Sequence, residues 1–198
     1  MTSQAQRRAS TIAAIVSAAS ELFTARGFAA TSIDDIASRA GVAKGAVYHH
    51  FDSKEQIFQR VFEQMTEALA AQVRATAATG KSILDSFERG TLKYLTSIAG
   101  DKFRQVLLID GPAVLGWQKW REIDARYFGG AMNAPIETTA HVRVSAREMA
   151  ATGHLIAGAL SEAALVCASS DHRVRDARDF TSALSDRAHA SLVSIRPF

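Results

Sequence analysis

Apolar residues recur at three- and four-residue spacing along almost the whole chain, and this periodicity is the strongest constraint on the fold. Such spacing places apolar side chains on one face of a helix, which can then pack against a neighbour. The first stripe consists of Ile12, Ile15, Val16, Ala19, Leu22 and Phe23. No alternating apolar and polar segment of useful length indicates a strand. The sequence therefore predicts an all-α protein.

Glycines and capping residues divide this pattern into helices. The first helix is expected to end near Arg26-Gly27, and Thr31 or Ser32 can cap the second, which stops at Gly41. The further helices are predicted at Ala43 to His50, at about 53–79, at 82–99, at 101–110, from Trp117 to Phe128 with an extension toward Thr139, at 145–168, and at 176–194. Capping boxes of Ser53 with Gln56 and of Ser145 with Glu148 mark the starts of two of them. Gly80 and Gly111-Pro112 are predicted breaks.

The composition is that of a soluble globular protein. The chain has 198 residues, of which 47% are hydrophobic and 22% charged, enough to bury a core. Residues 1–8 are polar and lack the apolar run of a secretory signal. The most apolar stretch, 155–168, is shorter than a membrane span and contains Ser161 and Glu162. Because Cys167 is the lone cysteine, no internal disulfide can form, and we expect a cytoplasmic protein with no membrane partner.

Net charge alone does not identify a partner. The chain carries 23 basic and 20 acidic residues, a formal net charge of +3. Residues 1–60 hold seven Lys or Arg and five Asp or Glu, so the N-terminal segment is not a basic block. A prediction of nucleic-acid binding must therefore rest on the order of residues.

Residues 36–47 have the spacing of a helix-turn-helix motif. Ala37 is small where a second helix must cross closely, and Gly41 can take the positive φ of a sharp turn. Val42 and Val47 are apolar and suited to packing the second helix onto the first. The N-terminal half of that second helix, including Lys44, then points outward, which is the end that enters a major groove.

The longer strings GFAATSI at 27–33 and GVAKGAVYHHFDSKE at 41–55 closely resemble the N-terminal domain of the TetR (tetracycline-repressor-type) family. The resemblance extends from residue 8 to about residue 62. It implies a three-helix DNA-binding domain over residues 1–55 and a larger helical domain over 56–198 for effector binding and dimerisation. The helix at about 53–79 would connect the two.

The resemblance also implies a set of DNA contacts. Thr31 and Lys54 match phosphate-contacting positions, Lys44 matches a position that reaches base edges, and Ala43 and Gly45 would lie close to the groove floor. The full predicted set is Thr31, Ala43, Lys44, Gly45, Tyr48, His49 and Lys54. Ala43 and Ala46 replace the Ser or Thr of many relatives, so two hydrogen-bonding groups are missing, although their methyl groups can contact thymine.

Structural roles are the alternative for several of these residues. Thr31 could be only a helix cap, Tyr48 a half-buried packing residue, and His49-His50 a solvated pair. The surrounding string favours DNA contact for Lys44, Tyr48 and Lys54, whereas His50 and Ser32 remain open between the two roles.

For the C-terminal part the family pattern implies a homodimer formed by the last two helices, with an effector pocket among the preceding ones. The segment 157–165 is rich in small residues, which suits either a dimer interface or a buried helix. The pocket candidates are aromatic and polar residues of the apolar middle: Tyr94, Phe103, Leu107, Asp110, Trp117, Trp120 and Tyr127. Each of them could instead belong to the core. Trp117 and Trp120 share a helical face, and a bend at Gly111-Pro112 could open space beside them.

We therefore expect a repressor that a small apolar molecule releases from a palindromic DNA operator. One alternative is an activator or architectural DNA-binding protein of the same fold without an effector, and a second is a helical enzyme or carrier. The sequence contains no Gly-rich phosphate loop, no His-Glu-x-x-His and no Gly-x-Ser-x-Gly, so neither catalysis nor a metal or other cofactor is predicted.

Overall fold

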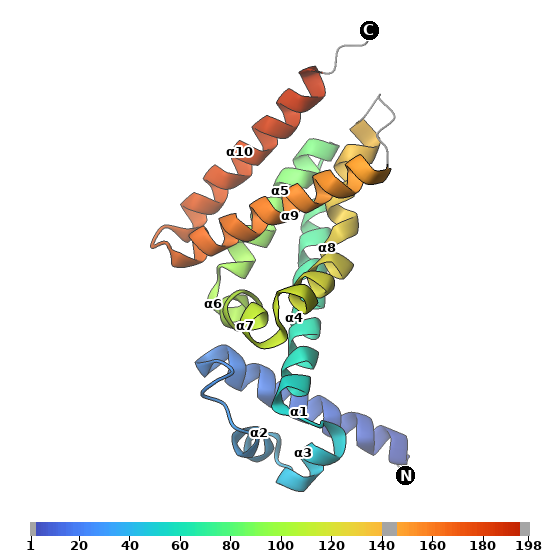
Figure 1. Ribbon diagram of the computed structural model, residues 1–198, viewed down its shortest axis with the longest axis vertical. Helices are drawn as coiled ribbons and strands as arrows, with labels where there is room; N and C mark the ends of the chain where they lie inside the picture. Colours follow the sequence, from blue (N-terminus) through green and yellow to red (C-terminus); the bar gives the residue numbers. More distant parts are fainter. Residues whose placement is uncertain (1–2, 140–145, 195–198) are drawn as a thin grey trace. The chain divides into compact units, whose positions relative to one another are not determined.

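The computed structural model describes residues 3–139 and 146–194, and every regular element within these ranges is a helix (Figure 1). The elements are α1 (Gln4–Arg26), α2 (Ile33–Ala40), α3 (Lys44–His50), α4 (Lys54–Ala77), α5 (Ile83–Ile98), α6 (Asp101–Phe103), the π-helix η1 (Arg104–Asp110), α7 (Gly111–Leu115), α8 (Trp117–Thr139), α9 (Ala146–Ser169) and α10 (Arg173–Ser194). The predicted all-α class is confirmed. Ser145, the predicted cap of the helix now labelled α9, lies outside the described residues.

Local hydrogen bonds explain where the N-terminal helices begin and end. Ser3 forms a capping box with Gln6, so α1 begins well before its apolar stripe. Ser32, not Thr31, caps α2, and Gly41 ends it in the left-handed conformation with φ of 68°. The predicted capping box of α4 is only half formed. The Gln56 amide donates to Ser53 Oγ at 3.2 Å, but the Gln56 side chain accepts from the Asp52 amide.

The chain stays helical across Gly111-Pro112, where the sequence predicts a break. Pro112 lies in the first turn of α7, where its missing N–H costs no helical hydrogen bond. Gly111 is buried, and a Cβ there would lie 2.6 Å from the Phe62 ring and 3.0 Å from the Trp120 ring. The glycine therefore permits close packing at this point, and the predicted opening beside it does not exist.

The chain forms two compact units, and their boundary differs from the predicted division after residue 55. Unit 1 comprises residues 1–66 and 101–120, and unit 2 comprises residues 67–100 and 121–198. Unit 1 therefore includes a segment from the middle of the chain. One reason is Asp110, whose carboxylate accepts hydrogen bonds from the Phe28 amide at 2.8 Å and from the Gln105 side chain at 3.1 Å.

Aromatic side chains form the centre of unit 1. Phe28 and Phe58 make an edge-to-face contact at 5.2 Å between ring centroids, and Phe23 and Phe62 extend the cluster to either side of Phe58. Phe23 and Phe58 are fully buried, as are Ile36 of α2 and Val47 of α3. Because these rings come from α1, the following loop and α4, they fix the platform on which α2 and α3 are packed.

Unit 2 contains the second half of α4, α5, most of α8, α9 and α10. Figure 1 shows α5 beside α9 and α10, and all three contact one another. Leu95, Ala164 and Ala177 are completely buried, one from each of these helices. The Arg173 guanidinium donates to the Ala99 carbonyl at 3.3 Å and so joins the start of α10 to the end of α5.

The helix α9 has the predicted length and contains the most apolar stretch of the chain. The segment Ala151–Ser169 has a mean hydropathy of 1.4 over a membrane-spanning length, although only 28% of it is buried within the chain. Length and composition alone are weak evidence for a membrane span, because the core helix of a soluble protein can have the same properties. The packing of Leu160, Ala163 and Ala164 inside unit 2 accounts for one apolar face.

Candidate DNA-binding surface and effector pocket

The helices α2 and α3 form the predicted helix-turn-helix. Ala37 is 4% exposed at the crossing, and Gly41 makes the turn in the left-handed conformation. Val47 is fully buried and attaches α3 to the rest of unit 1. The side of α3 away from this core is exposed and carries Ala43, Lys44, Gly45, Tyr48 and His49. We refer to these five residues as the α3 surface.

Lys44, the predicted base-reading residue, is paired with a carboxylate. Its Nζ lies 2.9 Å from Asp34 Oδ2, and both side chains are more than half exposed. The hydrogen bond to Asp34 raises the pKa of Lys44, so the ammonium remains charged. To contact a base, Lys44 must leave Asp34. Because such an exposed pair contributes only about 0–1 kcal/mol, the exchange costs little.

Thr31 does not present its hydroxyl for a phosphate contact. The residue is 1% exposed, and Thr31 Oγ1 donates to the Gly27 carbonyl at 2.8 Å. The start of α2 is already satisfied by Asp35, whose carboxylate accepts from the Ser32 amide and hydroxyl and pairs with Arg26 at 2.7 Å. These Ser32 hydrogen bonds, followed by the Arg26 charge, hold the pKa of Asp35 below its usual value. The implied phosphate role of the Thr31 side chain is therefore corrected to a structural one.

Lys54 has a role in holding the loop before α2. Its Nζ donates to the Phe28 carbonyl at 2.9 Å and to the Thr31 carbonyl at 2.8 Å, and it lies 4.0 Å from the centre of the Phe28 ring. An ammonium group has three donors, so one remains for a phosphate. The sequence analysis missed this contact because carbonyls 23 and 26 residues away give no local signal.

The aromatic residues at the end of α3 differ in exposure. Tyr48 is 51% exposed and His49 is exposed, so both can meet a nucleic acid. The His50 ring is half-buried beside His49, with 5.0 Å between ring centroids. Within the described chain, His50 Nδ1 is buried without a hydrogen-bond partner. Burial, followed by the nearby charges of His49 and Arg8, lowers the pKa of His50, which favours a neutral packing residue.

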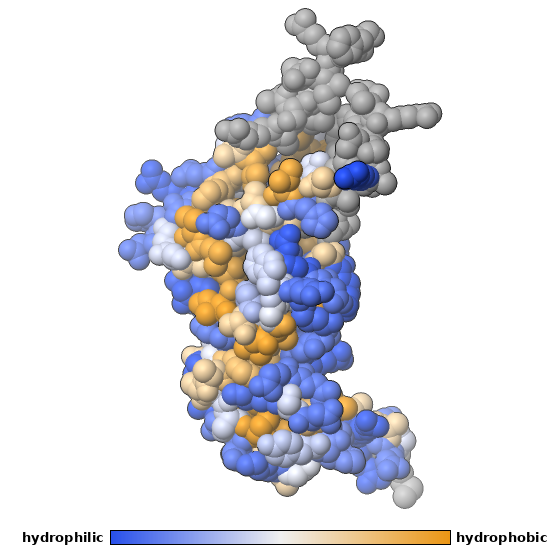
Figure 2. Space-filling model, in the orientation of Figure 1, coloured by the Kyte–Doolittle hydropathy of each residue, from blue (hydrophilic) through white to orange (hydrophobic). Residues whose placement is uncertain are grey.

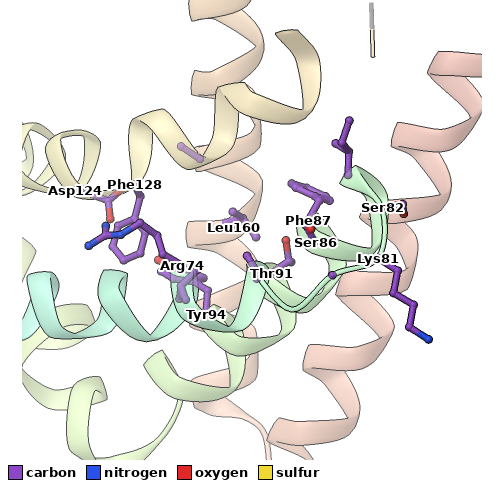
Figure 3. A pocket seen from close by; sticks show the side chains of 16 residues that line it. Arg74, Lys81, Ser82, Ser86, Phe87, Thr91, Tyr94, Asp124, Phe128 and Leu160 are labelled. Atoms are coloured by element: carbon purple, nitrogen blue, oxygen red, sulfur yellow. The ribbon is translucent and has the colours of Figure 1, made fainter. Parts of the chain in front are cut away.

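Unit 2 contains a cavity of about 540 Å³ between α4, α5, α8 and α9 (Figure 3). A cavity of this size is typical of small-molecule sites. Its lining consists of Val73, Arg74, Ala77, Gly80, Lys81, Ser82, Ile83, Ser86, Phe87, Gly90, Thr91, Tyr94, Asp124, Phe128, Ala157 and Leu160. Gly80 has no room for a side chain, because a Cβ would lie 2.5 Å from the Ser86 amide nitrogen. The chain therefore passes closely over α5 at this edge of the cavity.

Of the seven residues predicted for an effector pocket, the structure places only Tyr94 in this cavity. Phe103, Leu107, Asp110, Trp117 and Trp120 belong to unit 1, and Tyr127 does not line the cavity although it lies on α8. Phe103, Leu107 and Trp120 are core residues, and Trp120 Nε1 donates to the Leu107 carbonyl at 3.0 Å. Asp110 is engaged with Phe28, and Trp117 is 63% exposed.

The sequence analysis missed the remaining lining residues, and Asp124 is the most informative of them. Burial raises the pKa of Asp124 to about 6, and the Arg121 charge opposes this shift. Burial also raises the pKa of Tyr94, so its phenol stays neutral. The Tyr94 and Phe128 rings meet edge to face at 5.3 Å. The only sequence signal was an Asp in an amphipathic helix, which is more often exposed.

No group of three or more His, Cys, Asp or Glu side chains converges as a metal site among the residues that the structure describes. The fold and the exposed α3 surface thus define a helix-turn-helix protein with a separate cavity in its second unit.

Comparison with known proteins identifies the family. Residues 15–61 match the model for bacterial regulatory proteins of the tetR family, and residues 84–188 match the tetracyclin repressor-like C-terminal domain. The second match alone covers more than half of the chain. The chain therefore belongs to the TetR family, as the resemblance in the sequence implied. This membership supports a regulatory protein rather than an enzyme.

Individual relatives agree with this assignment. The chain is 32% identical over 128 residues to the Transposon Tn10 TetC protein of Escherichia coli, a match that covers 63% of each chain. It is 40% identical over 79 residues to the HTH-type transcriptional repressor KstR2 of Rhodococcus jostii, covering 40% of this chain and 36% of the relative. The matched part thus spans less than two thirds of these relatives.

Solved structures extend the likeness over nearly the whole chain. A TetR-family transcriptional regulator from Pectobacterium atrosepticum is 26% identical, with a TM-score of 0.78, and the match covers 98% of this chain and 100% of that one. The protein RolR, solved in complex with resorcinol, has a TM-score of 0.69 over 98% of this chain and 99% of its own, at 19% identity. This second likeness concerns the fold alone.

Proposed function

We propose that this protein is a transcriptional repressor that binds a DNA operator as a homodimer and leaves it when a small, largely apolar molecule fills the cavity of unit 2. The observation that carries the proposal is the exposed α3 surface on a helix-turn-helix scaffold. Its small residues, Ala43 and Gly45, allow close approach to a groove, and Lys44 and Tyr48 supply polar contacts. The family to which the chain belongs is one of cytoplasmic DNA-binding regulators, which supports the same location here.

We infer that an exposed apolar face of α9 packs against a second copy of the chain in the dimer. Leu155 is 74% exposed, Leu165 46% and Val166 41%, and Ala159 is exposed between them. Figure 2 shows hydrophobic residues gathered over α9. Ala164, which belongs to the same small-residue segment 157–165, is instead fully buried within its own subunit. A twofold dimer would present two α3 surfaces to a palindromic operator.

The cavity in unit 2 supports control by a ligand. Val73, Ile83, Phe87 and Leu160 provide an apolar lining, with few polar groups among them. The resorcinol-bound RolR structure is a neighbour that holds a small aromatic ligand. A ligand that binds more tightly to a conformation unsuited to DNA would shift the protein away from its operator.

The proposal as a whole is tested by recovering DNA that the purified protein retains from fragments of its own genome. We expect enrichment of short sites with twofold symmetry over random DNA at physiological salt. Addition of the cell's own small-molecule extract should release the retained fragments. Retention that does not distinguish any fragment from random DNA would contradict a sequence-specific regulator.

Substitution of Lys44 tests base reading by the α3 surface. Lys44→Ala should weaken binding to the retained site by about 1–3 kcal/mol and binding to random DNA by much less, because a base contact discriminates between sequences. Asp34→Asn should have the opposite effect on affinity. It should strengthen binding to random DNA, because it frees Lys44 and removes a negative charge near the phosphates. Lys102→Ala, an exposed lysine of unit 1 outside the motif, is the control. Equal losses on both DNAs would assign Lys44 to phosphate instead.

Substitution of Lys54 should affect stability and DNA binding together. Lys54→Met keeps the methylene stem over Phe28 but removes the donors to the Phe28 and Thr31 carbonyls. We expect a loss of about 1–2 kcal/mol in the free energy of unfolding, measured with urea, because the contacts are only part-buried. Binding to specific and random DNA should weaken by the same factor. The slope of the logarithm of the binding constant against the logarithm of salt concentration should fall in magnitude by about one. Unchanged stability would show that the two hydrogen bonds contribute nothing in solution.

A further inference from the structure

The cavity of unit 2 is lined by one carboxyl group, that of Asp124 on α8, which is half-buried in the cavity wall. Burial raises the pKa of Asp124, and the charge of Arg121 on the same helix lowers it by less. Partial burial of a carboxylate is unfavourable, so a cationic group placed beside Asp124 would bind with a gain.

The other two charged residues that line the cavity are both exposed. Arg74 of α4 is exposed, and its guanidinium donates to the Tyr127 carbonyl at 3.5 Å. Lys81, between α4 and α5, is exposed, and its side chain points away from the other labelled residues in Figure 3. The wall from α9 is formed by Ala157 and Leu160, which have no charge.

The surroundings of Asp124 suit a cation with an apolar body. Phe128 and Tyr94 lie at the same end of the cavity in Figure 3, and their rings are in contact. Aromatic faces attract a cation in addition to providing apolar surface. Phe87 and Leu160 line the middle of the cavity and can cover a hydrophobic body. Burial, followed by the charge of Asp124, raises the pKa of Tyr94, so its hydroxyl is neutral and can accept a hydrogen bond from the same head group.

We propose that the effector is an organic cation, a protonated amine on an aromatic or aliphatic body, whose ammonium group is bound by Asp124 and whose body fills the apolar part of the cavity. This proposal rests on the proposed ligand-responsive function and specifies its ligand class. A carboxylate ligand with the same body would be repelled by Asp124. A neutral alcohol could donate one hydrogen bond to Asp124 but would bring no positive charge to its carboxylate.

The test uses three probes with one shared body: 4-phenylbenzylamine, 4-phenylbenzyl alcohol and 4-phenylbenzoate. Calorimetric titration of the full-length protein at pH 7.5, without DNA, should give the tightest binding for the amine and the weakest for the benzoate, with about 10- to 100-fold between amine and alcohol. Asp124→Asn should remove this preference. Glu122→Gln, which removes an exposed carboxylate from the same helix, should preserve it.

The pH dependence provides a second readout. The amine stays protonated from pH 5 to 7.5, whereas Asp124 loses its proton as the pH rises through about 6. Amine binding should therefore tighten by up to tenfold per pH unit below 6 and level off above it, and the Asn variant should lose this dependence. The other titratable or charged groups that line the cavity are Tyr94, whose pKa burial raises, and the basic residues Arg74 and Lys81.

Two outcomes would overturn the ligand class: equal binding of the amine and the benzoate, or no binding of the amine at millimolar concentration. Neither would affect the proposed regulatory function, which fails only if the protein does not retain specific DNA. Loss of DNA binding in Asp124→Asn would also count against the proposal, because it would assign Asp124 to the fold.

Discussion

Trp120→Ala should lower the free energy of unfolding by about 3–5 kcal/mol, measured by urea denaturation followed by circular dichroism. The indole ring is 4% exposed and packs against Gly111, whose missing side chain leaves room for it. The substitution also removes the donor to the Leu107 carbonyl and leaves that buried acceptor unsatisfied. Truncation in such a closely packed place creates a void that the neighbouring Phe62 cannot fill without movement.

The matched control is Trp117→Ala on the same helix. Trp117 stacks on Trp120 at 4.9 Å between ring centroids, but it is 63% exposed, so we expect a loss of no more than about 1 kcal/mol. The comparison separates a core role from a ligand-binding role for the tryptophan pair. If Trp120→Ala keeps wild-type stability and loses only the response to an effector, the pair is a ligand site, as the sequence analysis expected.

Ala159→Arg should convert the dimer to a monomer and abolish operator binding at nanomolar protein concentration. Ala159 is exposed on the single subunit, so the substitution leaves the fold intact. In the proposed interface, twofold symmetry would bring two arginines into an apolar environment. Each unpaired buried charge costs several kcal/mol, so the dissociation constant of the dimer should rise by at least about a hundredfold. Light scattering over a range of protein concentrations measures this dissociation constant.

Ala75→Arg is the control, because Ala75 is also an exposed helical alanine of unit 2 but lies on α4. It should remain dimeric and bind DNA normally. Ala164→Arg, in contrast, should unfold unit 2, since Ala164 is completely buried within the subunit. A wild-type protein that is monomeric at micromolar concentration, or an Ala159→Arg variant that remains dimeric, would refute the proposed interface.

Local sequence patterns predicted the helix-turn-helix correctly because its determinants are local. Gly41 permits the left-handed turn that ends α2, and Val47 is an apolar residue of α3 that can be buried against the preceding helices. The helix ends at Ser32 and Gly41 follow from hydrogen bonds that span only a few residues. The same patterns could not reveal that Thr31 is buried or that Lys44 is paired with Asp34.

Of the residues predicted for an effector pocket, all but Tyr94 lie outside the cavity of unit 2, and there is a physical reason. Trp120 and Tyr94 are both large, apolar residues in amphipathic helices, and periodicity gives the same signal for a packed core as for a cavity wall. Whether space remains beside such a ring depends on residues that are distant in the chain, such as Phe62 beside Gly111.

The sequence by itself determined the all-α class, most helix ends, the turn at Gly41 and the family, because each depends on residues within a few helical turns. Only the tertiary structure decided that residues 101–120 join the N-terminal unit and that α9 presents Ala159 outward but Ala164 inward. It also placed Asp124 in a cavity with Tyr94 and Leu160. These features arise where helices from distant parts of the chain meet, and their burial and pKa values depend on that packing.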